Sequence, residues 1–172
     1  LITSKAVPEI IRENGGEPVR TRVGHSFIKA KMAETNAVFG GEHSAHYYFR
    51  DFWRADSGML AAMHVLAALG QQDKPLSEMM AKYNRYAASG EINSRLDSAE
   101  AQADRTEAVV KAFADRAENV DRLDGVTVEL KDGNWFNVRA SNTEPLLRLN
   151  VEADTQEAVD ALVKEILAII RA

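Results

Sequence analysis

The chain of 172 residues contains no cysteine, which excludes disulfide bonds and metal sites built from thiolates. No stretch approaches the ~20 consecutive apolar residues of a membrane-spanning helix. The first residues do not form the basic and then apolar leader that is typical of secreted proteins. We therefore expect a globular protein of the cytoplasm, with no membrane partner.

The net charge of −5 is unevenly distributed along the chain. Residues 1–97 carry 12 Lys and Arg against 11 Asp and Glu, whereas residues 98–172 carry 9 against 15. An acidic half is a poor surface for nucleic acid, so we expect no nucleic-acid partner. An anionic ligand would need local clusters of cations. The candidates are Arg20, Arg22, Lys29 and Lys31 around His25, and the pair Arg139 and Arg148.

Residues 1–92 alternate between short apolar runs and helical patterns, which predicts an α/β domain with a mixed, largely parallel sheet. The expected elements are a strand remnant at 1–3, helices at 7–14 and 26–35, strands at 18–23 and 37–39, and helices after Asp56-Ser57 and after Pro75.

A polar segment at 93–103 is the expected linker, and 104–172 is predicted to be a small α+β domain with an antiparallel sheet and two helices. Asp104-x-x-Glu107 resembles a capping box at the start of its first helix. Asp132-Gly133 indicates a hairpin turn between strands. Apolar residues alternate along the strands at Val126, Val128 and Leu130 and at Leu147, Leu149 and Val151, so Arg148 is expected on the opposite face.

The stretch Arg-Ala-Ser-Asn-Thr-Glu-Pro, residues 139–145, joins two strand-like runs through a tight polar loop. Arg139 offers a planar fork of donors that matches phosphate geometry. Ser141, Asn142 and Thr143 add hydroxyl and amide groups, and a sharp turn can direct backbone N–H groups inward. The loop is a candidate phosphate cradle; the alternative is a polar hairpin loop with a satisfied arginine.

A second polar loop, Gly-Gly-Glu-His-Ser-Ala-His at 40–46, precedes an aromatic run. It combines a carboxylate, a hydroxyl and two imidazoles, which are the groups that bind sugar hydroxyls. Trp135 and the Tyr47-Tyr48 pair could stack on a sugar face, although core packing is the default interpretation. His64 lies within a helical pattern and is interpreted as a packing residue.

The two loops, in this order, resemble the C-terminal part of the α-D-phosphohexomutases, in the phosphomannomutase/phosphoglucomutase branch. GEHSAH resembles the sugar-recognition loop of the third domain, and RASNTEP the phosphate-binding loop of the fourth. VGHSFIKAKM, DSGMLAAMHVLAAL and LLRLNVEAD agree with the same family. Ala45 departs from the pattern, because glycine is common there.

The resemblance implies an enzyme that interconverts hexose 6-phosphate and hexose 1-phosphate through a phosphoserine and a bisphosphorylated sugar. It implies sugar contacts from Glu42, Ser44, His46 and His25, with His46 also a possible proton shuttle. It implies phosphate contacts from Arg139, Ser141, Asn142, Thr143 and Arg148. Glucose 1,6-bisphosphate is the implied activator.

The family's phosphoserine and its Asp- and Gly-rich magnesium loop belong to the first two domains, and neither motif occurs in this sequence. We therefore expect a C-terminal piece, comprising most of the third domain and the fourth. It would hold no catalytic residue and no metal, and would be inactive without the N-terminal domains as partners.

Three alternatives remain open. Phosphoglucosamine mutases usually have glutamine and glycine where this chain has His43 and Asn142, and that activity is the runner-up. A non-catalytic module that binds a phosphosugar is the second alternative, and a metal site on His43-x-x-His46 with Glu42 or His25 is the third. The sequence does not separate mannose from glucose.

Overall fold

The computed structural model describes residues 2–141 and 144–172 and divides the chain into two units after Arg85. The linker was expected at 93–103. That segment contains part of a paired strand and the first turn of a helix, and two of its polar residues, Ser94 and Gln102, are buried there.

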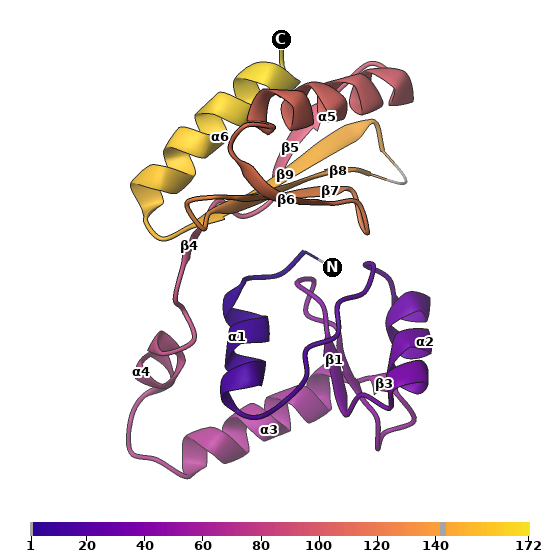
Figure 1. Ribbon diagram of the computed structural model, residues 1–172. Coiled ribbons are helices and arrows are strands. Elements are labelled where there is room, and N and C mark those ends of the chain that lie inside the picture. The colour runs from indigo at the N-terminus through magenta and orange to yellow at the C-terminus, as the bar shows by residue number, and fades with distance from the viewer. Residues whose placement is uncertain (1, 142–143) are drawn as a thin grey trace. The chain divides into compact units, whose positions relative to one another are not determined.

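The N-terminal unit contains four helices and one small sheet (Figure 1). The helices are α1 (Ala6–Glu13), α2 (His25–Thr35), α3 (Gly58–Gly70) and α4 (Leu76–Ala81). The strands are β1 (Phe39–Gly41), β2 (Tyr47–Phe49) and β3 (Ala55–Asp56), paired in the order β1-β2-β3.

All the strand pairs described in this unit are antiparallel, so the largely parallel sheet expected here is corrected. Residues 2–3 and 18–23 form no strand. The connection between β1 and β2 is a short hairpin loop, and a parallel pair would need a crossover of about a dozen residues. Pro18 also lacks the amide donor that a strand ladder uses. The mixed α and β character itself is confirmed.

Packing in this unit centres on α2 and the hairpin. Ile28, Met32 and Tyr48 form its buried cluster. A Cβ on Gly40 would lie 3.0 Å from both Ile28 Cγ2 and Met32 Sδ, so a larger residue there would force these two side chains of α2 to shift. Ser57 Oγ accepts a hydrogen bond of 3.1 Å from the Leu60 amide and so caps α3, the helix expected after Asp56-Ser57.

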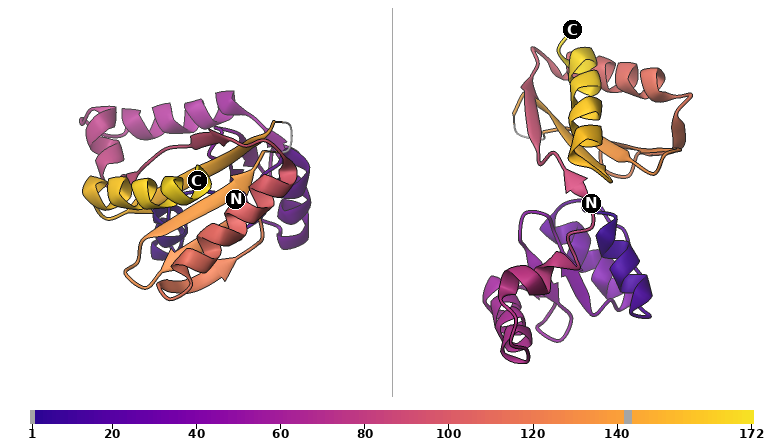
Figure 2. Two further views of the ribbon diagram at one scale, coloured as in Figure 1. Left: turned by 90° about the horizontal axis from the view of Figure 1, so that it is seen from above. Right: turned by 90° about the vertical axis from the view of Figure 1, so that its left-hand side faces the viewer.

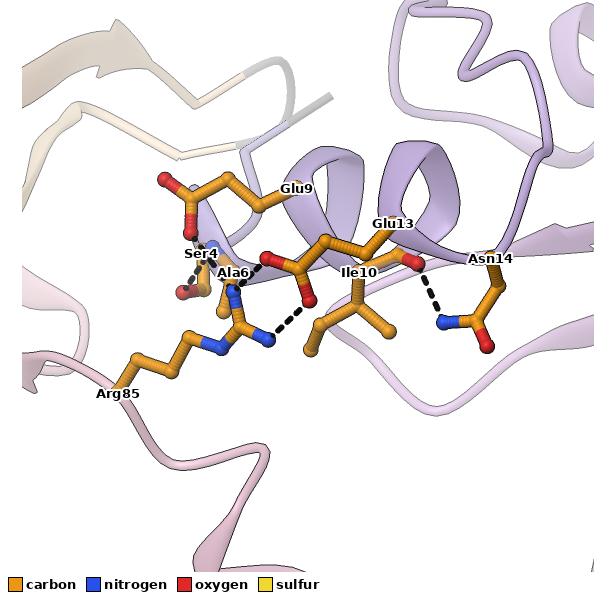
Figure 3. Close-up of polar contacts among 7 residues, drawn as sticks. All are labelled: Ser4, Ala6, Glu9, Ile10, Glu13, Asn14 and Arg85. Atoms are coloured by element: carbon orange, nitrogen blue, oxygen red, sulfur yellow. Dashed lines mark hydrogen bonds and ion pairs between the residues drawn. The ribbon is translucent and has the colours of Figure 1, made fainter.

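Arg85, the last residue of the unit, is bound to two carboxylates of α1 (Figure 3). Its guanidinium donates to both Glu13 oxygens at 2.7 and 2.6 Å and to Glu9 at 3.3 Å. The hydrogen bond to Arg85 lowers the pKa of Glu13, and the same contact raises the pKa of Arg85. One arginine thus ties the end of the unit to its first helix.

The C-terminal unit is a six-stranded antiparallel sheet with two helices (Figure 1). The antiparallel sheet and the two helices confirm the prediction, whereas the number of strands was not predicted. The strands are β4 (Ala87–Ala88), β5 (Ile92–Arg95), β6 (Ala117–Asp121), β7 (Val126–Leu130), β8 (Trp135–Ala140) and β9 (Leu146–Ala153). Their order is β4-β9-β8-β7-β6, and β5 also pairs with β9. Helices α5 (Ala99–Phe113) and α6 (Gln156–Ile170) lie on the same face of the sheet (Figures 1 and 2).

The covered face of this sheet carries the apolar residues whose alternation the sequence displays. Val128, Leu147 and Leu149 are fully buried against the helices, and the Phe113 and Phe136 rings meet edge to face at 4.9 Å. The opposite face therefore carries the polar set, including Arg148, as predicted.

Of the two local features predicted in this unit, the hairpin turn is confirmed and the helix cap is not. Asp132 Oδ1 accepts from the Asn134 amide at 3.0 Å and Gly133 has a φ of 90°, which confirms the hairpin turn. The capping box predicted at Asp104 is wrong: α5 begins five residues earlier, where Ser98 Oγ accepts from the Ala101 amide at 3.1 Å. The earlier serine supplies the cap, so Asp104 lies inside the helix.

Candidate functional site

Arg139 and Arg148 lie directly opposite each other on β8 and β9, on the sheet face away from the helices. Like charges at opposed positions of an antiparallel pair repel each other, since their side chains start only about 5 Å apart. Arg139 makes no ion pair with any residue that the structure describes, and its Nε is buried without a hydrogen-bond partner. The pair thus concentrates positive charge that the described residues only partly neutralise.

Arg148 is the better satisfied member of the pair. Its guanidinium lies 3.4 Å from Ser141 Oγ, 3.6 Å from Glu91 and 3.8 Å from Glu144. These contacts are long for charge-assisted hydrogen bonds, and within the described part of the chain its buried Nε also has no partner. Glu91, which immediately precedes β5, is a partner of Arg148 that the sequence analysis did not identify.

The loop after β8 is closed by backbone contacts around Ser141. Its amide donates to the Leu146 carbonyl at 2.8 Å, and its Oγ accepts from the Glu144 amide at 3.3 Å. These bonds place the Ser141 hydroxyl beside Arg148. Asn142 and Thr143, also predicted to bind phosphate, lie outside the described residues.

Gly125 is a second position that sequence reasoning missed. It precedes β7 with a φ of 66°, and a Cβ there would lie 2.6 Å from the Val138 carbonyl oxygen and 2.7 Å from Arg139 Cβ. Only glycine therefore allows the chain to pass beside Arg139. Aspartate followed by glycine at 124–125 was the available signal, since that dipeptide marks turns.

In the N-terminal unit, the 42–46 loop closes the hairpin between β1 and β2. The Glu42 amide donates to the His46 carbonyl at 2.9 Å, and the Ala45 amide donates to the Glu42 carbonyl at 3.0 Å. Ala45 has a φ of 65°, in the left-handed region that favours glycine, which explains why glycine is common there in the resembling family. Ser44 and His43 are exposed at the tip.

The side chain of Glu42 is oriented by a hydrogen bond from a buried tyrosine. The Tyr48 hydroxyl donates to Glu42 Oε1 at 2.5 Å, and burial of Tyr48, followed by this contact, raises the pKa of the phenol. Tyr48 is fully buried and is therefore a core residue rather than a sugar-stacking surface. Trp135 is likewise buried, and its indole N–H donates to Glu152 at 2.8 Å.

His46 forms a short contact with Asp56, to which the sequence analysis gave no role in the site. Its Nδ1 lies 2.6 Å from Asp56 Oδ2, and Asp56 Oδ1 accepts from the Tyr47 amide at 2.9 Å. The hydrogen bond to Asp56 raises the pKa of His46, and the same bond, with that from Tyr47, lowers the pKa of Asp56. With Nδ1 bound, the Nε2 edge of the ring is the one available to a ligand.

The remaining histidines are positioned by aromatic packing. His25, the first residue of α2, meets the Tyr48 ring edge to face at 5.3 Å. It is therefore grouped with Glu42 around one tyrosine. His64 stacks on Phe49 at 5.5 Å and is a packing residue, as predicted.

The described residues contain no group of three or more His, Cys, Asp or Glu side chains that could hold a metal ion. His43-x-x-His46 therefore lacks the further ligand that a zinc site requires. Among the described helices, none is long and apolar enough to cross a membrane.

Family comparison gives a consistent answer for both units. Residues 1–86 match the phosphoglucomutase/phosphomannomutase alpha/beta/alpha domain III, and residues 91–169 match the C-terminal domain of the same enzymes. The chain therefore belongs to the phosphoglucomutase/phosphomannomutase family.

Individual relatives agree with this assignment. A phosphomannomutase of Methanocaldococcus jannaschii is 42% identical over 97% of this chain, and one of Escherichia coli is 40% identical over 95%. The crystal structure of a family protein from Burkholderia thailandensis covers 97% of the chain with a TM-score of 0.77 at 28% identity. The chain spans only 36% and 35% of the two phosphomannomutases and 36% of the Burkholderia protein.

Proposed function

We propose that this chain supplies sugar and phosphate recognition to an enzyme that interconverts hexose 6-phosphate and hexose 1-phosphate. The hexose would be mannose or glucose, and the reaction would pass through a phosphoserine and a bisphosphorylated sugar. The relatives named phosphomannomutase support the reaction class. The observation that carries the role of this chain is the opposed pair Arg139 and Arg148.

A bound phosphate dianion would neutralise the positive charge of Arg139 and Arg148. Arg139 and Arg148 are paired across β8 and β9, and among the described residues neither Nε, though buried, has a hydrogen-bond partner. Phosphate oxygens accept several N–H bonds at once, and the arginine fork matches their spacing. Ser141 adds a hydroxyl beside Arg148. We propose that Asn142 and Thr143 complete this phosphate site.

The 42–46 loop is the proposed contact for the sugar hydroxyls. Glu42 is held by Tyr48 and His46 by Asp56, so both side chains are oriented before a ligand arrives. Ser44 lies exposed at the tip between them. Preorganised acceptors and donors of this kind select hydroxyl positions with little loss of side-chain entropy on binding.

The proposed reaction requires the phosphate at the non-reacting end of the sugar to be held while the other end reacts. Positioning of this kind supplies much of the catalysis in phosphoryl transfer. In this proposal Arg139 and Arg148 hold that phosphate, and Glu42 and Ser44 hold hydroxyls. His46, whose Nδ1 is bound to Asp56, would exchange protons through Nε2.

The serine that carries the phosphoryl group and the Mg²⁺ that the family reaction implies would belong to other parts of a longer enzyme. The described residues do not fit a metal, as no cluster of three ligands exists among them. We therefore derive no step through Mg²⁺. The proposal also takes glucose 1,6-bisphosphate as activator and the cytoplasm as location.

The test is a titration of this chain with mannose 1-phosphate, glucose 1-phosphate and glucosamine 1-phosphate, followed by NMR. We expect shifts of the amides at 41–46 and around 139–141, and loss of the second set in Arg139→Ala. Arg122→Ala is the matched control, since Arg122 pairs with Glu107 on the same unit and is not part of the candidate site. Stronger shifts with glucosamine 1-phosphate would favour the phosphoglucosamine mutase alternative. Loss of binding in the control as well as in Arg139→Ala would contradict the assigned phosphate site.

A further inference from the structure

Two carboxylates lie beside Arg148 without forming close hydrogen bonds to it. Arg148 Nη1 is 3.6 Å from Glu91 Oε2, and its Nη2 is 3.8 Å from Glu144 Oε2. A charge-assisted hydrogen bond between nitrogen and a carboxylate oxygen is only about 2.7–2.9 Å long. Neither carboxylate therefore fixes the orientation of the arginine fork, but both reduce the positive charge around it.

Glu91 is the more effective of the two carboxylates, because it is closer to Arg148 and less exposed. The side chain of Glu91 is 37% exposed and that of Glu144 is 58% exposed, whereas that of Arg148 is 25% exposed. Solvent screens an exposed charge more strongly than a half-buried one. The charge of Glu91 therefore acts more strongly on an anion at this sheet face.

The position of Glu91 is set by the backbone on both sides of it. Before it, the Ser89 amide donates to the Val151 carbonyl at 2.9 Å, and Ser89 Oγ accepts from the Val151 amide at 2.9 Å. After it, Ile92 of β5 pairs with Leu149. Both neighbouring segments are thus attached to β9, the strand that carries Arg148. Glu91 is held beside the arginine by strand pairing and does not depend on the long contact between their side chains.

The sheet face beside Glu91 carries a third arginine. Arg95 of β5 lies opposite Leu146, which is two residues from Arg148 and therefore on the same face. Three arginines start from this face: Arg95, Arg139 and Arg148. The two carboxylates offset part of their charge. Without that offset, a phosphate dianion would meet a much more positive surface.

The proposed reaction needs a phosphate site that releases its ligand in every cycle. Each end of the sugar reacts in turn, so the site must hold first one phosphate and then the other. Interactions that bind substrate and transition state equally raise affinity without speeding the chemical step. Differences in affinity at one site are mostly differences in dissociation rate, so excess positive charge would slow the exchange.

We propose that Glu91 is a resident counter-charge that limits how tightly Arg139 and Arg148 hold phosphate. This inference rests on the proposed function, because it assigns a role to a residue beside the proposed phosphate site. A residue that oriented Arg148 would strengthen phosphate binding, whereas Glu91 weakens it through its charge. An anion bound to Arg148 lies within about 10 Å of Glu91, which is the Debye length at 0.1 M salt, so the repulsion reaches it.

The test is Glu91→Gln, which removes the charge and keeps the shape of the side chain. Inorganic phosphate and mannose 1-phosphate are titrated calorimetrically into the full chain at low ionic strength. We expect the dissociation constant of each ligand to fall about two- to fivefold, as for partly exposed charges. The gain should shrink in 1 M NaCl, where the Debye length is about 3 Å. Glu118→Gln on β6, three strands from β9, is the matched control and should leave both constants unchanged.

Several results would overturn the inference. Unchanged or weaker phosphate binding by Glu91→Gln would mean that Glu91 is neutral or orients Arg148. Tighter binding of inorganic phosphate with weaker binding of mannose 1-phosphate would make Glu91 a sugar contact. An equal gain in Glu118→Gln would reduce the effect to net charge. In all these cases the unaltered chain still binds phosphate, so the proposed phosphate site stands. If neither the unaltered chain nor Glu91→Gln bound phosphate, the proposed site would fail and the inference with it.

Discussion

Arg139 of β8 is paired with Arg148 of β9, so two guanidinium groups start from directly opposed positions of one sheet face. Like charges at opposed positions destabilise a strand pair, and an anion bound beside them would offset that repulsion. The opposition predicts that stability and phosphate binding will change in opposite directions when one arginine is removed.

We expect Arg139→Ala to leave the free energy of unfolding unchanged or slightly raised in chloride, because a repulsive partner is lost. Phosphate should no longer stabilise the variant. For the unaltered chain, phosphate at a hundred times its dissociation constant should add about 2.7 kcal/mol. Urea unfolding in phosphate and in chloride at equal ionic strength measures both effects. A variant that keeps the full phosphate-dependent increase would show that the anion binds elsewhere.

The three strands β7, β8 and β9 of the C-terminal sheet were predictable because their signals are local. Alternation at Val126, Val128 and Leu130 and the Asp132-Gly133 turn depend only on neighbouring residues, and the structure confirms them. The strand expected at 18–23 in the N-terminal unit does not form. It would need a pairing partner that the described residues do not provide. Local pattern indicates strand tendency, whereas pairing decides whether a strand forms.

The candidate site also contains residues that the sequence indicated and partners that it did not. The residue types at 42–46 and 139–145 were visible as motifs, but the partners that orient them were not. Asp56 lies ten residues from His46, and their contact depends on the register of β2 and β3. Glu91 reaches Arg148 only because β5 pairs with β9. Such partners come from tertiary structure, which no local spacing encodes.

The His46–Asp56 contact predicts a pH dependence. Because the pKa of His46 is raised by Asp56, the contact stabilises the fold fully below the unfolded histidine value of about 6.5. This stabilisation is lost as pH rises through the raised pKa of the folded chain. Because the pKa of Asp56 is lowered, its contribution is lost only as pH falls through that lower value. The contact is therefore strongest between about pH 4 and 6.5.

NMR titration of the His46 ring checks this dependence. Asp56→Asn should return the His46 pKa toward its ordinary value and flatten the stability profile between pH 6 and 8, a range chosen around the histidine value of about 6.5. His43 in the same loop serves as the internal control, since no contact with Asp56 is described for it. An unchanged His46 titration in Asp56→Asn would refute the assigned cause.

Tyr48→Phe separates sugar recognition from phosphate recognition. The variant keeps the buried ring but removes the hydroxyl that donates to Glu42, so the carboxylate loses its fixed orientation. We expect the dissociation constant for mannose 1-phosphate to rise about fivefold or more, since hydrogen bonds to charged groups contribute about 1.5–3 kcal/mol. Binding of inorganic phosphate should not change. Calorimetry with both ligands gives the two constants, and equal losses for both would argue against a separate sugar contact.

Arg85 is predicted to act by neutralising two acidic residues one helical turn apart. Glu9 and Glu13 lie at i and i+4 on α1, where like charges repel, and Arg85 binds both. Arg85→Ala should therefore destabilise the N-terminal unit and increase amide exchange in α1. The same substitution in a Glu9→Gln, Glu13→Gln background should have a much smaller effect. Equal effects in the two backgrounds would mean that Arg85 acts through packing of its aliphatic stem.

Ala45→Gly tests the strain in the candidate sugar loop. Ala45 adopts a φ of 65°, and a left-handed conformation costs a residue with a Cβ roughly 1–2 kcal/mol. Glycine removes that strain but increases the entropy of the unfolded chain, so the net gain should be about 0.5–1 kcal/mol. Urea unfolding, monitored by the fluorescence of Trp53 in the same unit, measures this change in the free energy of unfolding. The matched control is Ala62→Gly in the exposed interior of α3, where the same change should cost about 1 kcal/mol. Destabilisation at both positions would show that the loop carries no strain at Ala45.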